Sequence, residues 1–292
     1  MFDILTSYTF IISAIGAVIL SIASGVVGTV SVLKGQSLIG DAIGHSAFPG
    51  IVVIFMAFQT RDPLILLFGA FVSGAIAYFL IEIINNNSRL KMDTSLAIVL
   101  SSMFGLGMVL KSYISGNPTF TKTTQAGLMN YIFGQAALIL EEDVILIAVI
   151  GFTSLILFAI FYKELKLFIF DREFAYISNF RPRLISVLVL VMTMTLIAVG
   201  LKTVGAILIS SLLITPTIIG LQWSNKYSIV ILLAMLSGGL SAFLGTYIAS
   251  TSLGYPNGPA IIVVMSILAI FSMVFGKRGI VRLYIERKRA NG

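Results

Sequence analysis

The chain contains no cysteine, one histidine and one tryptophan among its 292 residues. Without cysteine it can form neither a disulfide nor a thiolate metal site, so any transition-metal site must use nitrogen and oxygen ligands. Charge is also scarce, because Asp, Glu, Lys and Arg make up 11% of the residues against roughly 25% in soluble domains. A chain that is 58% hydrophobic and so poor in charge is predicted to be an integral membrane protein with little soluble mass.

Several short motifs are missing as well. The sequence has no G-x-x-x-x-G-K-[ST] loop, so it cannot bind ATP through a P-loop of its own. Active transport would therefore draw its energy from a partner or from an ion gradient. Cysteine is absent and position 2 is phenylalanine, so no lipidation is expected from this sequence. The first apolar run lacks a basic n-region and exceeds signal-peptide length, so it is predicted to remain as a transmembrane helix.

The hydrophobic residues are gathered into runs of about 20 residues, the length that a helix needs to cross a bilayer. They predict an all-α fold, a polytopic membrane helix bundle of about nine transmembrane spans that forms a single domain over 1–292. The sixth and seventh runs meet at Lys202, so we expect either a tight hairpin or partly broken helices, which would leave eight spans. The nine predicted spans are 8–32, 37–58, 63–84, 94–114, 142–162, 183–201, 203–221, 227–250 and 258–276.

Lysine and arginine predict the orientation of the chain. With the N-terminus outside and nine spans, all but four of the 19 basic residues fall on the inner side, as is typical of cytoplasmic loops. The sequence therefore favours an outer N-terminus, a cytosolic C-terminus and a large internal cytosolic loop at 163–182. The four exceptions are Arg61, Lys111, Lys122 and Lys202.

The single histidine, His45, follows Asp41 by four residues inside the second predicted span. Positions i and i+4 of a helix share a face, so the carboxylate and the imidazole point the same way. An ionisable residue within a membrane segment costs roughly 2.5–3.5 kcal/mol on insertion scales, which favours a functional role. Since carboxylate and imidazole suit manganese, zinc or iron, Asp41 and His45 form a candidate divalent-metal site. The alternative is that Asp41 caps a kinked helix and His45 is a satisfied core residue.

Pro49 and three nearby glycines weaken the second predicted helix around this pair. Broken helices near the bilayer midplane are how many transporters expose their binding groups. Counted from Lys34, the pair lies two to three turns into the span, which predicts a depth near the middle of the bilayer. A proline within the seventh span would likewise free a backbone carbonyl to line a cation path. The candidates for this pathway are Ser46, Thr215 and Pro216.

Three segments outside the spans have polar or charged patterns. Segment 115–141 is predicted to lie outside and ends in an acidic trio, which either steers cations or simply begins the next helix. Segment 171–179 is predicted to be a short amphipathic cytosolic helix, either a docking surface or a plain connector. The basic tail 277–292 is predicted to lie against anionic membrane lipid. The acidic trio consists of Glu141, Glu142 and Asp143.

Five motifs, in order along the chain, resemble one family of membrane proteins. The similarity covers about 10–280, and its specificity comes from all five occurring together. The chain resembles the permease subunit of the bacterial manganese/zinc/iron uptake ABC transporters. The motifs are Lys34–Asp41 with His45 and Pro49–Gly50, Gln125–Leu128 with Phe133–Gln135, Asp171–Ala175, Val204–Leu208 with Thr215–Pro216, and Pro256–Pro259.

This resemblance implies both partners and sites. It implies a second permease copy, two cytosolic ATP-binding subunits and an extracellular metal-binding protein, with no permanently bound cofactor and with manganese favoured over zinc or iron as cargo. It places the metal site on Asp41 and His45, and a helix that couples to the ATPase on 171–179. Asn179 stands where the family usually has glycine, and asparagine tolerates the left-handed conformation better than most residues. The implied coupling residues are Asp171, Glu173, Phe174, Ala175 and Asn179.

Two other classes of protein compete with an ABC permease. A secondary carrier driven by an ion gradient would use the same midplane pair, but such carriers often contain internal repeats, and no clear repeat is present. An intramembrane enzyme would need a catalytic set, and Asp41, His45 and Ser46 form only a nominal triad. Adjacent residues on a helix, such as His45 and Ser46, do not face each other.

Overall fold

The computed structural model describes residues 5–60, 62–117, 120, 140–171, 182–251, 256–282 and 288. Within these ranges all the regular elements are helices, and nine of them are long and apolar enough to cross a membrane. The predicted all-α polytopic fold is confirmed, and the helix ends lie within about one helical turn of their predicted positions. The helices are α2 (Tyr8–Leu33), α3 (Ile39–Phe58), α4 (Pro63–Asn87), α5 (Met92–Gly116), α8 (Glu141–Ile160), α9 (Tyr162–Phe170), α11 (Pro182–Thr203), α12 (Gly205–Trp223), α13 (Tyr227–Thr251) and α14 (Asn257–Phe275).

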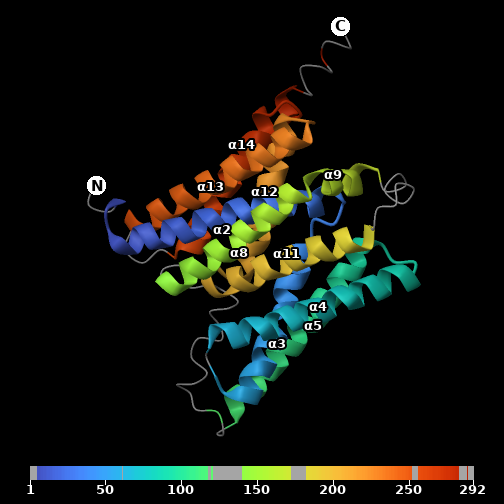
Figure 1. Ribbon diagram of the computed structural model, residues 1–292, viewed down its shortest axis with the longest axis vertical. Helices are drawn as coiled ribbons and strands as arrows, with labels where there is room; N and C mark the ends of the chain where they lie inside the picture. Colours follow the sequence, from blue (N-terminus) through green and yellow to red (C-terminus); the bar gives the residue numbers. More distant parts are fainter. Residues whose placement is uncertain are drawn as a thin grey trace.

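The helices pack in two groups (Figure 1). Helices α3, α4 and α5 contact one another at one edge of the bundle, and α2, α12, α13 and α14 form the larger group. Helix α11 contacts members of both groups, and α12 also touches α3. The helix that bears the candidate metal pair therefore lies where the small group meets the large one.

A glycine turn sets the start of α3. Gly35 has a positive φ of 71°, which an L side chain rarely adopts. Its N–H donates to the Val32 carbonyl at 3.0 Å, and the Gln36 N–H donates to the Ser31 carbonyl at 2.9 Å. This pair of bonds is a Schellman motif, which satisfies the last carbonyls of α2 and reverses the chain. The turn is short, so α3 begins at Ile39 directly beside the end of α2.

Glycines allow the helices of each group to approach closely. A side chain on Gly28 of α2 would overlap the Leu213 carbonyl of α12, and one on Gly50 of α3 would lie 2.1 Å from the Gly69 carbonyl oxygen of α4. Small residues at such crossings are the usual way to gain contact in lipid, where the hydrophobic effect between helices is absent. The first crossing fixes α2 against α12, and the second fixes α3 against α4.

The sixth and seventh spans form a hairpin rather than broken helices. Only Val204 separates α11 from α12, and Gly205 follows with a φ of 82°. A Cβ on Gly200 would lie 2.6 Å from the Ile209 side chain, so the two helices fold back on each other at once. Of the two sequence interpretations, the hairpin with nine spans is confirmed.

Helix α9 is an element that the sequence analysis did not anticipate. The fifth span was predicted to run to 162, but α8 ends at Ile160 and a separate nine-residue helix follows from Tyr162 to Phe170. Asp171, the first residue of the helix predicted at 171–179, is the C-cap of α9, and its N–H donates to the Leu167 carbonyl. The rest of that prediction, at 172–179, lies outside the described residues.

The acidic trio begins helix α8. All three acids lie in its first turn, where carboxylates interact favourably with the helix dipole. Glu141 accepts a hydrogen bond from the Tyr8 hydroxyl, and Asp143 accepts one from the Leu140 N–H at 3.2 Å. These contacts support the interpretation of the trio as a helix start.

Candidate metal site

Helix α3 presents Asp41 and His45 on one face, as their spacing predicts. The Asp41 Oδ1 and His45 Nε2 atoms are 3.5 Å apart. The two side chains are 34% and 21% exposed, so neither is sealed in dry helix packing. This partial exposure favours an accessible pair over the alternative in which His45 is a satisfied core residue.

Neighbouring helices border the pair on two sides. Gly40, which precedes Asp41, packs against Leu213 of α12. On the other side, the His45 ring makes an edge contact with Phe104 of α5, with ring centroids 5.1 Å apart. Asp41 and His45 thus lie on the strip of α3 between its contact with α12 and its contact with α5. One wall of this strip is aromatic, which restrains the imidazole.

The pair lies closer to the start of α3 than the sequence predicted. Because α3 begins at Ile39, Asp41 is in its first turn and His45 in its second. At 1.5 Å rise per residue they stand about 3 and 9 Å along the helix axis from Ile39. The difference arises because Lys34 to Leu38 form the turn after α2 and add no helical length.

The pathway candidates are not gathered around the pair. Ser46 is buried against α4, where its carbonyl accepts a 2.6 Å hydrogen bond from the Ser73 hydroxyl. Its own Oγ is buried without a hydrogen-bond partner. Pro216 packs between Gly25 of α2 and Gly238 of α13, whereas Thr215 is half-buried. Of the predicted metal-site and pathway residues, the structure therefore brings together only Asp41 and His45.

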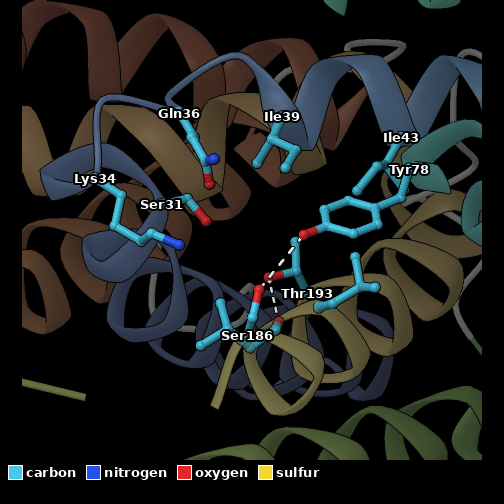
Figure 2. Close-up of a pocket in the computed structure, with 10 residues that line it drawn as sticks. Ser31, Lys34, Gln36, Ile39, Ile43, Tyr78, Ser186 and Thr193 are labelled. Carbon is cyan, nitrogen blue, oxygen red and sulfur yellow. Dashed lines mark hydrogen bonds between the residues drawn. The ribbon is translucent and has the colours of Figure 1, made fainter. Parts of the chain in front are cut away.

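A small polar cavity lies on the opposite side of α3. Its volume is about 20 Å³, enough for one water molecule. Ile39 and Ile43 form its α3 wall, and Figure 2 shows the Tyr78 hydroxyl pointing toward Ser186 and Thr193. The Tyr78 and Ser186 hydroxyl oxygens are 3.5 Å apart. Since neither Asp41 nor His45 lines this cavity, it is separate from the candidate metal site.

The described residues supply no third carboxylate or imidazole to the pair. Within the part of the chain that the structure describes, no group of three or more His, Asp or Glu side chains could hold a metal. Sequence reasoning missed Phe104, because an aromatic residue in an apolar helix has no local signal of contact. It also missed the Gly69–Ser73 face of α4, although two small residues four apart are a recognisable packing pattern.

The chain is similar to known membrane transport proteins along nearly its whole length. Residues 7–276 match the model of a family described as the ABC 3 transport family. The zinc transport system membrane protein TroC of Treponema pallidum is 34% identical over 287 residues, covering 98% of this chain and 95% of TroC. The manganese transport system membrane protein MntC of Bacillus subtilis is 37% identical over 281 residues, covering 94% of this chain and 64% of MntC.

A solved structure has the same fold. PsaBC from Streptococcus pneumoniae, determined in complex with Fab, superposes with a TM-score of 0.81 at 26% identity and covers 97% of this chain and 96% of the matched chain. The family match spans nearly all the transmembrane helices. The chain therefore belongs to the ABC 3 transport family.

Proposed function

We propose that this chain is the permease subunit of a bacterial ABC importer that moves a divalent transition-metal cation into the cytoplasm. The Asp41–His45 pair is the observation that carries the proposal. Two donor atoms about 2.1 Å from one metal, in tetrahedral arrangement, are about 3.4 Å apart. The Asp41 Oδ1 and His45 Nε2 atoms are 3.5 Å apart, which is close enough for both to ligate one cation.

A site of two protein ligands suits transport, because a conducting site must bind a cation and then release it. The remaining ligands would come from water or from a second permease copy, since both side chains are partly exposed. Relatives of this chain are named for zinc and for manganese. Nitrogen and oxygen ligands accept manganese, zinc or iron, and we favour manganese as the cargo from the sequence motifs.

The proposal includes the partners that a permease without a P-loop needs. Two cytosolic subunits would hydrolyse ATP, an extracellular protein would deliver the metal, and residues 1–292 would act as one membrane domain with its C-terminus in the cytosol. The chain's relatives TroC and MntC are each named as the membrane protein of a transport system, which supports a permease that works with partner subunits.

A contact between Lys34 and helix α9 supports coupling of the ATPase to the metal pair through segment 171–179. Helix α9 leads directly into that segment, and the Lys34 ammonium lies 3.9 Å from the centroid of the Phe168 ring of α9. Lys34 belongs to the turn that sets the start of α3. Movement of a docked ATPase at 171–179 would thus reach the turn before Asp41 through a cation–π contact.

Deleting the gene is expected to lower cellular content of one metal and to slow growth only when that metal is limiting. Growth and metal content would be measured under separate manganese, zinc and iron limitation, with complementation by the intact gene. Uptake should stop when the ATPase partner is inactivated and should survive an uncoupler. Uptake that persists without the ATPase but collapses with the uncoupler would instead establish a gradient-driven carrier.

The substitution Phe174→Pro is expected to uncouple ATP hydrolysis from transport, because proline breaks a helix at the proposed docking segment. ATPase activity of the assembled complex would be measured with and without metal-loaded binding protein, and the expected result is the loss of stimulation. Stimulation equal to that of the wild-type complex would remove the docking role from 171–179.

A further inference from the structure

A basic groove lies where α12 and α14 end and α13 begins, far along the chain from Asp41 and His45. Its volume is about 520 Å³, within the range of small-molecule sites. Of the described residues that line it, four are cationic and exposed and none is acidic. The lining residues are Trp223, Ser224, Asn225, Lys226, Ile229, Lys277, Arg278 and Arg282.

Three contacts hold the two banks of this groove together. The Arg278 N–H donates to the Gln222 carbonyl at 3.1 Å, and the indole N–H of Trp223 donates to the Ser272 hydroxyl at 3.1 Å. A Cβ on Gly276 would lie 2.9 Å from the Gln222 carbonyl oxygen, so only glycine permits this approach. The cationic side chains of the two banks are therefore displayed on a fixed backbone frame.

The groove opens onto apolar helix surface. Ile229 in the groove is 40% exposed, and Leu232 and Leu236 continue that face along α13 at 54% and 53% exposure. Phe271 and Phe275 lie exposed on α14 with ring centroids 4.9 Å apart. Trp223 is the last residue of α12. Tryptophan is enriched at membrane–water interfaces, so its position is typical of a helix end at the membrane surface. The charged groove thus adjoins an exposed apolar face of α13, and exposed aromatic side chains occupy the last turns of α14 before Lys277.

We propose that this groove binds an anionic phospholipid, with the phosphate among Lys226, Lys277 and Arg278 and the acyl chains along α13 and α14. The positive charge of the groove favours an anionic head group, because basic pockets between the cytoplasmic ends of transmembrane helices bind lipid phosphate groups. The positive end of the α13 dipole, next to Lys226, adds to the attraction. This lipid site is separate from the proposed transport function. It also differs from the predicted lipid contact of the basic tail 277–292, because it includes the turn between α12 and α13.

The single tryptophan of the chain makes the proposal directly measurable, because all indole fluorescence comes from Trp223. The full-length protein would be reconstituted in phosphatidylcholine bilayers. One preparation would contain brominated phosphatidylglycerol, and the other would contain the same amount of brominated phosphatidylcholine. Brominated phosphatidylglycerol is expected to quench the fluorescence far more effectively at equal content. The substitution pair Lys226→Gln and Arg278→Gln is expected to lower relative affinity for the anionic lipid roughly 30-fold.

A matched control removes the same charge elsewhere. Arg89 and Lys91 are exposed cations between α4 and α5, and the pair Arg89→Gln and Lys91→Gln should leave the quenching selectivity unchanged. Equal quenching by both brominated lipids in the wild-type protein would overturn the proposal, as would equal loss of selectivity in both double variants.

Two further experiments test whether the groove binds a phospholipid rather than free phosphate or a protein partner. Excess inorganic phosphate should leave the selectivity in place, since it lacks acyl chains, and displacement by phosphate would overturn a lipid as the source. ATPase subunits should still co-purify with the Lys226→Gln and Arg278→Gln variant. If that variant loses the ATPase subunits but keeps its lipid selectivity, the groove is a protein-docking surface and the proposal is wrong.

Discussion

Cells that express Asp41→Ala or His45→Ala are expected to lose metal uptake by at least about 100-fold. The reason is that each change removes one of two ligands, whereas loss of even an outer-shell partner costs 10–100-fold in metal sites. Both side chains are partly exposed, so truncation leaves no sealed cavity and membrane insertion should be unchanged. Accumulation of radiolabelled metal, normalised to the amount of protein in the membrane, measures the effect.

Asp93→Ala is the matched control for the aspartate. Asp93 is an exposed carboxylate in the first turn of α5, as Asp41 is a carboxylate in the first turn of α3. Uptake in this variant should match the wild type, since Asp93 has no histidine four residues later. Normal accumulation in both Asp41→Ala and His45→Ala would remove the site assignment, even if the chain still transports metal.

Gly50→Ala is expected to destabilise the protein and to impair uptake although it touches neither proposed ligand. The new Cβ would lie 2.1 Å from the Gly69 carbonyl oxygen and 2.5 Å from the Ser73 Cβ, so α4 must move away from α3. Overpacking of this kind costs about 1–3 kcal/mol. The shift would also break the Ser73 to Ser46 hydrogen bond, one residue from His45. A lower melting temperature in detergent and slower uptake are the expected results.

Gly105→Ala provides the comparison for this overpacking. No atom lies within 4 Å of a Cβ built on Gly105, in the same group of helices, so the change adds the same methyl group without a clash. Its melting temperature should equal or slightly exceed that of the wild type, because alanine favours a helix over glycine. A Gly50→Ala protein as stable and active as Gly105→Ala would show that the α3–α4 crossing is not tight.

The sequence by itself determined the number, type and approximate limits of the spans. In lipid each spanning segment must satisfy its own backbone, so a local apolar run is enough to predict a helix. The shared face of Asp41 and His45 was also predictable, because it follows from helical periodicity within one segment. The family resemblance rested on motifs that are equally local, and the family match confirmed it.

The tertiary structure alone decided which faces meet and which stay open. Neither the edge contact of Phe104 with His45 nor the packing of Pro216 between α2 and α13 has a local signal, since each joins residues far apart in the chain. Helix α9 likewise depends on packing, as its Phe168 lies over the Lys34 ammonium. The basic groove arises only because α14 returns to the end of α12, which places Arg278 beside Lys226. Local hydrophobicity specifies a helix, but the partner of each helix face depends on how the spans pack around one another.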